Sequence, residues 1–265
     1  MSPTTPPALS PLLDLGGRVA LVTGASRGIG AATARLLGRC NARVAIHFGR
    51  SRAEAEAVAA EIALSGGPPA ALFQAELASD DERRRLHREV AAVLGDPLLL
   101  VHNAGIYVRN PFEETDDAAF LSRWRTTQAV NLEAAAHLTL LSLPAMRAAR
   151  FGRVVMVASR AAFRAETDAA SYAVSKAGMV SLARCLARNE GKHGITANAI
   201  CPGWVDTAMA RPDVAARRAE IEGEVPLGRI ATPEDCARAI LFYLSPLASY
   251  ANGTALGLNG GSFLH

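Results

Sequence analysis

The chain has 265 residues, half of them hydrophobic and a fifth charged, and 28 Lys and Arg against 25 Asp and Glu give a formal net charge of +3. This balance excludes disorder over most of the chain, and the length is enough to bury a large core in one or two domains. The positive charge is spread out, without a basic tail or zinc-finger spacing, which argues against nucleic acid as a partner.

The first residues, 1–14, predict a flexible leader, because they are rich in proline and small polar residues and lack the basic start and apolar stretch of a signal peptide. No later segment reaches membrane-spanning length, so we expect no membrane partner. The cysteines are far apart and form no CxxC pair, which fits a reducing cytoplasm. We expect all four to be buried small residues: Cys40, Cys185, Cys201 and Cys236.

Apolar, strand-like runs alternate with helical stretches from residue 18 onward. In chain order we expect a strand 18–24, a helix 31–40, a strand 42–48, a helix 53–66, a strand 69–77, a charged helix to Leu94, a strand 97–105, a helix through Asn131 to Ala149, a strand 152–159, a helix from Tyr172 to Asn189 and a strand 195–203. Within the charged helix, acids and bases alternate over residues 82–89, which indicates a solvated face.

This order predicts one α/β domain over residues 15–265, a Rossmann-type doubly wound parallel sheet with helices on both faces. Alternating strands and helices produce a parallel sheet, and strands that are apolar at successive positions belong in a sheet covered on both faces. The segment 206–227 breaks the rhythm with charges and two prolines. We expect it to be either a mobile substrate lid or an ordinary surface helix pair.

A glycine-rich loop, Thr-Gly-Ala-Ser-Arg-Gly-Ile-Gly over residues 23–30, joins the first strand directly to a helix. Glycines at such a turn let the backbone approach a pyrophosphate, and the helix N-terminus offers N–H donors. The alternative is a tight turn that only requires small residues. The position of the loop, after the first strand, favours a nucleotide site.

Tyr172 and Lys176 are four residues apart in a helical segment, so their side chains leave the same face about one turn apart. An ammonium near a phenol favours the phenolate and lowers the phenol pKa toward neutrality. Such pairs are also common on helix surfaces. Ser159 supports the functional interpretation, because it ends a strand at the sheet edge where open α/β sheets bind ligands.

Together these motifs resemble the classical short-chain dehydrogenase/reductase family. The resemblance covers almost the whole chain and adds Asn103-Ala104-Gly105 after the fourth strand, Asn131 in a helix, and Pro202-Gly203 with Thr207 after the sixth. It implies an oxidoreductase that uses NAD(P) to interconvert a ketone or aldehyde and an alcohol by hydride transfer. The catalytic residues that it implies are Asn131, Ser159, Tyr172 and Lys176, with Ser159 binding the substrate oxygen and Tyr172 as general acid/base.

The resemblance also implies contacts to the cofactor and to a small-molecule substrate. For the cofactor these are Gly24, Ser26, Arg27, Gly28, Ile29, Gly30, Arg50, Ser51, Glu76, Leu77, Asn103, Ala104, Gly105, Tyr172, Lys176, Pro202, Gly203, Val205 and Thr207. Around the substrate they are Ser159, Ala161, Tyr107 and Trp204. Lys176 would contact the nicotinamide ribose, and Asn131 would support a proton path beside it.

The end of the second strand, residues 45–52, carries no carboxylate, which an NAD-binding site would place on the adenosine ribose. Arg50 and Ser51 instead can bind a 2′-phosphate, with Arg27 on its other side. We therefore expect NADP(H) in preference to NAD(H). The alternative is that Arg50 and Arg52 are solvated charges, which leaves the preference open.

Three further questions stay open at this point. Arg150 stands where 3-oxoacyl-ACP reductases carry a carrier-docking arginine, but His193 occupies their second docking position and the loop before Tyr172 lacks their glycines, so we prefer a general ketone/alcohol oxidoreductase. A noncatalytic NADP-binding regulatory protein is the alternative from another class, although the catalytic set is complete. The six histidines show no metal-ligand spacing, so we expect no metal, and the resemblance implies a homotetramer or a dimer.

Overall fold

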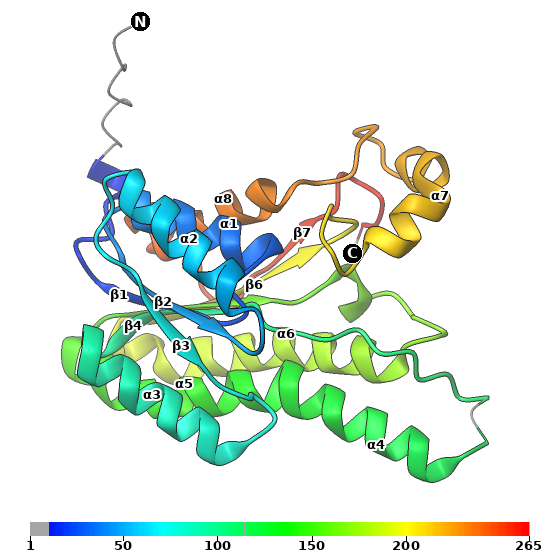
Figure 1. Cartoon of the computed structure of the whole chain (residues 1–265), viewed down its shortest axis with the longest axis horizontal. Helices are drawn as coiled ribbons and strands as arrows, with labels where there is room; N and C mark the ends of the chain where they lie inside the picture. Colours follow the sequence, from blue (N-terminus) through cyan, green and yellow to red (C-terminus); the bar gives the residue numbers. More distant parts are fainter. Residues whose placement is uncertain (1–10, 114, 265) are drawn as a thin grey trace, which may run out of the picture.

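The computed structural model describes residues 11–113 and 115–264. Its centre is a seven-stranded parallel sheet in the order β3-β2-β1-β4-β5-β6-β7 (Figure 1). The strands are β1 Val19–Val22, β2 Arg43–Phe48, β3 Ala71–Gln74, β4 Pro97–His102, β5 Gly152–Val157, β6 Ile195–Pro202 and β7 Ala255–Leu258. The strand order reverses direction between β1 and β4, and ligands of open α/β sheets bind at such a point.

The helices are α1 Gly28–Arg39, α2 Arg52–Leu64, α3 Asp80–Leu94, α4 Asp117–Gln128, α5 Ala134–Ala149, α6 Ala170–Glu190, α7 Arg211–Gly223 and α8 Pro233–Leu244. Buried residues of α1, α2 and α8 form one apolar cluster with the sheet, and those of α3, α5 and α6 form a second. Neighbouring residues of β1 belong to opposite clusters, Val22 to the first and Leu21 to the second. Both faces of the sheet are therefore covered, which confirms the predicted doubly wound α/β fold.

The segment before α5 differs from the expected regular helix. Residues Ala129–Glu133 form a π-helical turn between α4 and α5, and Asn131 lies in its middle. π-helical turns are rare, frequently occur at functional sites, and leave no signal in apolar periodicity. The turn consequently gives Asn131 a position that a regular helix would not give it.

The expected solvated face of α3 is wrong at one position. Arg83 is only 2% exposed, pairs with Asp80, and donates from Nη1 to the carbonyl oxygens of Leu77 (3.1 Å) and Ala129 (3.4 Å). The carbonyl of Leu77 before α3 and that of Ala129 at the start of the π-helical turn therefore hold this side chain inside the protein. Alternating charge in the sequence could not reveal the Ala129 acceptor, because it comes from a distant segment.

The cysteine expectation needs one correction. Cys40, Cys201 and Cys236 are buried and free, but Cys185 is exposed on α6. Its neighbour Ala183 is buried and Arg184 is exposed, so Cys185 lies on the outer side of the helix. In the described part of the chain, no helix has the length and apolar character needed to cross a membrane.

Two predicted segments lie outside the main core. Of the predicted leader, residues 1–10 fall outside the described residues, and Pro11–Leu13 form a short 3₁₀ turn. In the segment 206–227, α7 is kinked at Arg217 and packs through its own small cluster of Val214, Ile221 and Ile230, with Trp204 beside it. The mobility of this segment stays a prediction.

Candidate active site

The four predicted catalytic residues meet at the carboxyl edge of the sheet. Ser159 follows β5 directly, Tyr172 and Lys176 lie one turn apart at the start of α6, and Asn131 comes from the π-helical turn. The Ser159 side chain lies beside the phenol of Tyr172 and lowers its pKa. The Ser159 Oγ also accepts a hydrogen bond from the backbone N–H of Ala161 at 3.1 Å, which fixes its orientation.

Asn131 connects the loop after β4 to α6. Its Oδ1 accepts from the N–H of Ile106 (2.8 Å), and its Nδ2 donates to the carbonyl of Ile106 (3.1 Å) and to the Oγ of Ser175 (3.0 Å). A Cβ atom added at Gly105 would lie 3.4 Å from both Asn131 Oδ1 and Lys176 Nζ. Gly105 therefore lies where the amide and the ammonium converge, and a Cβ there would be in van der Waals contact with both.

Lys176 is almost completely enclosed, at 4% exposure. Its Nζ donates to the carbonyl of Val157 at 2.7 Å and lies 5.6 Å from the centre of the Tyr172 ring. Burial lowers the pKa of Lys176 to about 8, because removing an ammonium from water favours its neutral form. The lysine is thus held by backbone on one side and by the tyrosine ring on the other.

Burial is the largest influence on the pKa of Tyr172. Burial raises the pKa of Tyr172 to about 12, and the Ser159 side chain lowers it by less than burial raises it. Activation of the phenolate by the lysine stays a prediction. The ring of Tyr107 contacts that of Tyr172 edge-on, with centres 5.1 Å apart, and leaves Tyr107 42% exposed at the site.

The glycine loop has the geometry of an anion cradle. Gly24 and Gly28 have positive φ angles of 64° and 56°, which L side chains rarely adopt. A Cβ added at Gly30 would lie 2.3 Å from the carbonyl oxygen of Gly24. The side chain of Arg27, which precedes α1, provides no cap for the first N–H groups of that helix, so these donors are available to a pyrophosphate. The residues present thus fit a dinucleotide cofactor.

Asn103 and Thr23 hold this loop against the end of β4. The Nδ2 of Asn103 donates to the carbonyls of Thr23 (2.9 Å) and Gly24 (3.0 Å), while Thr23 Oγ1 accepts from the N–H groups of Asn103 and Ala104 (both 3.0 Å). The side chain of Asn103 therefore points to the loop. Its expected contribution to cofactor binding would be made through the loop backbone.

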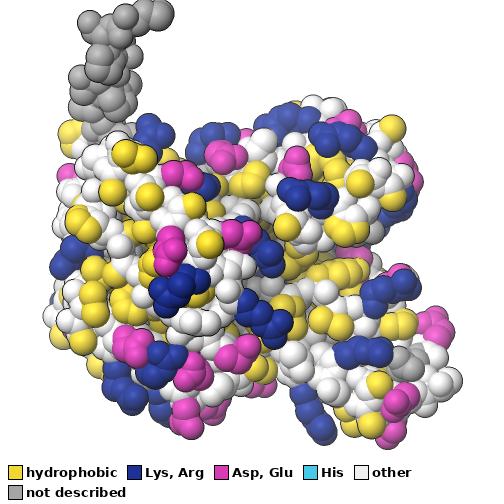
Figure 2. Space-filling view, viewed as in Figure 1, with side chains coloured by type: hydrophobic (Ala, Val, Ile, Leu, Met, Phe, Trp, Pro, Cys, Tyr) yellow, Lys and Arg dark blue, Asp and Glu magenta, His cyan; other side chains and the backbone are white. Residues whose placement is uncertain are grey.

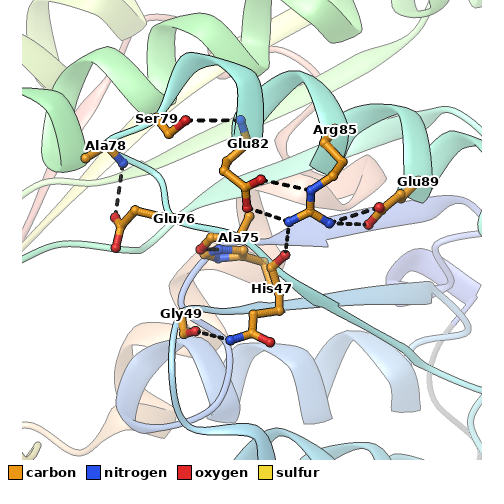
Figure 3. Close-up of polar contacts among 10 residues, drawn as sticks. His47, Gly49, Ala75, Glu76, Ala78, Ser79, Glu82, Arg85 and Glu89 are labelled. Carbon is orange, nitrogen blue, oxygen red and sulfur yellow. Dashed lines mark hydrogen bonds and ion pairs between the residues drawn. The ribbon is translucent and has the colours of Figure 1, made fainter.

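The predicted adenosine end opens into a cavity of about 600 Å³ at the β3 edge of the sheet, lined in part by Arg50, Arg52 and Glu76 (Figure 3 shows the polar contacts on its β3 and α3 side). The carboxylate of Glu76 accepts from the N–H of Ala78 at 3.2 Å. Arg27 and Arg50 are exposed and form no ion pair within the described residues. Both arginines are therefore available to a phosphate.

Arg85 also lines this cavity but is already occupied. Its guanidinium pairs with Glu82 and Glu89 and donates to the carbonyl of Gln74 at 2.8 Å (Figure 3). These acceptors saturate the side chain, so Arg85 has little capacity to bind a phosphate. At the adenosine end, the positive charge available to a phosphate therefore comes from Arg50 and Arg52, which follow β2.

The substrate side is enclosed by two loops that sequence reasoning did not connect. Arg109 pairs with Asp168 (2.9 Å), and the N–H of Asn110 donates to the Asp168 carbonyl (2.7 Å), next to a parallel bridge between Asn110 and Ala169. The loop after β4 and the loop before α6 thus form one wall. No local pattern signals a pairing between residues some 60 positions apart.

The other predicted substrate and nicotinamide residues come from the loops after β5 and β6. Ala161 is buried next to Ser159, Trp204 is half-buried, and Val205 forms a bridge with Ala231. Thr207 lies against the glycine loop, because a Cβ at Gly28 would be 3.2 Å from its Cγ2. Figure 2 shows the molecular surface hollowed between the α7 and α4 regions, with apolar side chains in the hollow.

Comparison with known proteins identifies the family. The family model described as enoyl-(acyl carrier protein) reductase matches residues 24–262. A 3-oxoacyl-(acyl-carrier-protein) reductase of Pseudomonas aeruginosa is 36% identical over 252 residues, which cover 95% of this chain and all of the relative. The chain belongs to the short-chain dehydrogenase/reductase family. It is therefore an oxidoreductase that acts on CH–OH and C=O groups with a nicotinamide cofactor, and the resemblance seen in the sequence is confirmed.

Other relatives within the family are named for different activities. A D-beta-hydroxybutyrate dehydrogenase of Cupriavidus necator is 32% identical and covers 93% of this chain and 98% of its own length. A crystal structure of a putative gluconate 5-dehydrogenase from Beutenbergia cavernae, with bound NADP, superposes with a TM-score of 0.87 at 39% identity, covering 95% of this chain and 98% of that one. Membership of the family therefore does not by itself select a substrate.

Proposed function

We propose that the protein is an NADP(H)-dependent oxidoreductase that interconverts a ketone or aldehyde and an alcohol, with Tyr172 as general acid/base. The observation that carries this proposal is the convergence of Ser159, Tyr172, Lys176 and Asn131 next to a glycine loop with free N–H donors. Each residue has a chemical task that its environment supports.

In the reductive direction the bound cofactor supplies the hydride. The Ser159 hydroxyl binds the carbonyl oxygen of the substrate, and Tyr172 gives its phenolic proton to that oxygen as the alcohol forms. A pKa of about 12 keeps Tyr172 protonated at neutral pH, as a general acid requires. Lys176 and Asn131 support the arrangement of these two side chains. Oxidation of the alcohol uses the same groups in reverse.

The NADP(H) preference rests on Arg50 and Arg27, which are exposed and unpaired within the described residues at the adenosine end, where β2 provides no carboxylate. The solved relative, described as NAD(P)-dependent, holds NADP at low occupancy, so a related site accepts the phosphorylated cofactor. Replacing Arg50 by Asp should raise the KM for NADPH far more than that for NADH, since it exchanges an attractive charge for a repulsive one. Equal effects on both cofactors would remove the argument.

A panel of ketones, aldehydes and alcohols, assayed with NADPH and NADH, tests the function directly. We expect turnover of at least one class, with higher kcat/KM for the phosphorylated cofactor. Binding of NADPH without turnover of any carbonyl or alcohol would instead favour the noncatalytic NADP-binding protein.

The second candidate is a 3-oxoacyl-ACP reductase. The P. aeruginosa relative carries that name, and Arg150, which ends α5 in a left-handed conformation, is exposed to a docking partner. His193 at the second docking position opposes it. A 3-oxoacyl group presented on an acyl carrier protein should then react with a KM well below that of the same group on a small thiol, and Arg150→Glu should abolish the difference.

A further inference from the structure

His47 is a buried side chain that connects the glycine loop to the adenosine end of the cofactor site. It lies near the end of β2, is 3% exposed, and is held between the segments that follow β1 and β3. Nothing in the spacing of the histidines marks it, because its partners are backbone groups of distant segments.

Both ring nitrogens of His47 have backbone partners. Nδ1 lies 3.0 Å from the N–H of Gly24, and Nε2 lies 3.1 Å from the carbonyl of Ala75 (Figure 3 shows His47 beside Ala75). An amide N–H can only donate, so Nδ1 must be the unprotonated acceptor, and Nε2 therefore carries the hydrogen and donates to Ala75. Burial lowers the pKa of His47 to about 4, which keeps the ring in this neutral form at neutral pH.

The backbone of the same residue extends this connection. The carbonyl of His47 accepts from the N–H of Ala25 at 2.8 Å, so one residue binds two consecutive N–H groups of the glycine loop. The carbonyl of Gly24 is bound by Asn103. Because both the N–H and the carbonyl of Gly24 have partners within the protein, the N–H groups at the start of α1 are the donors available to the pyrophosphate.

The two ring contacts lie at opposite ends of the dinucleotide's adenosine diphosphate half. Gly24 begins the loop that would face the pyrophosphate, and Ala75 directly precedes Glu76, which would face the adenine. Movement of the ring would therefore disturb both contacts together.

We propose that His47 is a positioning residue for the cofactor, which sets the glycine loop and the segment before Glu76 at the spacing that the adenosine diphosphate half of NADP(H) requires. This inference rests on the proposed function, because it assumes the cofactor site described above. His47 itself touches no reacting atom.

The test measures NADPH binding to the purified 265-residue chain through the fluorescence of the nucleotide. His47→Ala removes both ring contacts and should weaken binding roughly ten-fold, the effect of one buried hydrogen bond left unmade. His47→Asn keeps an acceptor near the Nδ1 position and His47→Gln keeps a donor near the Nε2 position, so each retains one of the two contacts and should bind NADPH more tightly than the Ala variant but more weakly than the wild type. The matched control is His87→Ala, a partly buried histidine of α3, which should leave binding unchanged.

A second measurement separates positioning from general damage. At saturating NADPH all three His47 variants should keep kcat within about two-fold of the wild type, because the defect lies in cofactor affinity. Equal binding of NADPH by His47→Ala and the wild type would overturn the inference. If His47→Ala does not fold, wild-type binding by both the Asn and the Gln variants would overturn it. Failure of the wild type to bind either NADPH or NADH would overturn the proposed function itself.

Discussion

Tyr172 shows how burial competes with charge at the level of single residues. The phenol is removed from water, and this raises its pKa more than the Ser159 side chain lowers it. Lys176 is buried as well, and its pKa falls to about 8 for the same physical reason, since both groups prefer their neutral forms. A proton is therefore present on Tyr172 at neutral pH before any substrate arrives.

Tyr172→Phe tests the catalytic role. The ring and its packing against Tyr107 are retained, but the proton donor is lost, so we expect turnover to fall by roughly 10²- to 10⁴-fold. NADPH affinity and the thermal midpoint should stay near wild type, as measured by nucleotide fluorescence and thermal unfolding. Near-normal turnover would exclude Tyr172 from the mechanism.

The buried ammonium of Lys176 should make stability depend on pH. Its folded pKa of about 8 lies below the unfolded value of 10.5, so between these limits the unfolded chain binds more protons and the contribution of this group to stability rises with pH. Compared with Lys176→Met, the wild type should gain on the order of 1–3 kcal/mol between pH 7 and 10, measured by urea unfolding. Other titrating groups cancel in the comparison, and a constant difference would contradict the lowered pKa.

At the scale of elements, the site is built by loops and turns at the ends of strands and helices rather than by the interiors of those elements. The glycine loop, the π-helical turn and the joined loops after β4 and before α6 each bring backbone groups to one edge. The helices themselves are stabilised locally, for example α8, where Thr232 and Asp235 form a reciprocal capping box. Stability and binding should therefore respond to different substitutions.

Gly30→Ala should impair the glycine loop. The added methyl group would lie 2.3 Å from the Gly24 carbonyl, so the loop must shift, and NADPH binding should weaken ten-fold or more, on the order of 1–2 kcal/mol. Gly223→Ala in α7 is the control, since a Cβ there has no neighbour within 4 Å. Equal NADPH affinities for the two variants, measured by fluorescence titration, would show that the loop tolerates the shift.

Thr232→Ala should act on stability alone. The Oγ1 of Thr232 accepts from the N–H of Asp235 at 3.3 Å, and loss of such a cap costs about 1 kcal/mol in urea unfolding. Since α8 covers the sheet face opposite α6, kcat/KM should not change. Reduced catalytic efficiency with unchanged stability would contradict this separation of roles.

At the scale of the whole molecule, charge is balanced and apolar surface is distributed unevenly. Figure 2 shows basic and acidic side chains intermixed on one face, in agreement with the small net charge. Leu140 on α5 and Val174 on α6 are 63% and 49% exposed, and Phe242 on α8 and Leu256 on β7 are also exposed. The apolar side chains on α5, on α6 and at the β7 edge form surfaces on which copies of the chain can associate.

We therefore expect the predicted homotetramer in solution, with a mass by light scattering of four times the 27.8 kDa chain. Leu140→Glu should reduce the mass to that of a dimer or monomer, because it places a charge in an apolar contact. Arg188→Glu, at an exposed polar position of α6, is the matched charge change and should leave the mass unaltered. A monomeric wild type would contradict the prediction.

Much of this protein followed from its sequence, because strand and helix periodicity, the glycine loop and the Tyr172/Lys176 spacing are local patterns with direct physical causes. The α/β order gave the doubly wound sheet, and Ser159 was expected at its carboxyl edge, where the structure has it. What the sequence did not reveal depends on contacts between distant segments. Arg83 is bound by the Ala129 carbonyl of the π-helical turn, and Asn110 joins a loop some 60 residues away.

The +3 charge and the length determined by themselves only that the chain is globular and that no strong field steers its partners. The motifs then determined the family and the residue types at the site. Only the tertiary structure decided the state of those residues: that Lys176 is held by the Val157 carbonyl, that burial raises the pKa of Tyr172, and that His47 binds the glycine loop at Gly24. The physical reason is that pKa values and backbone hydrogen bonds depend on desolvation and on partners far apart in sequence, which a local pattern cannot encode.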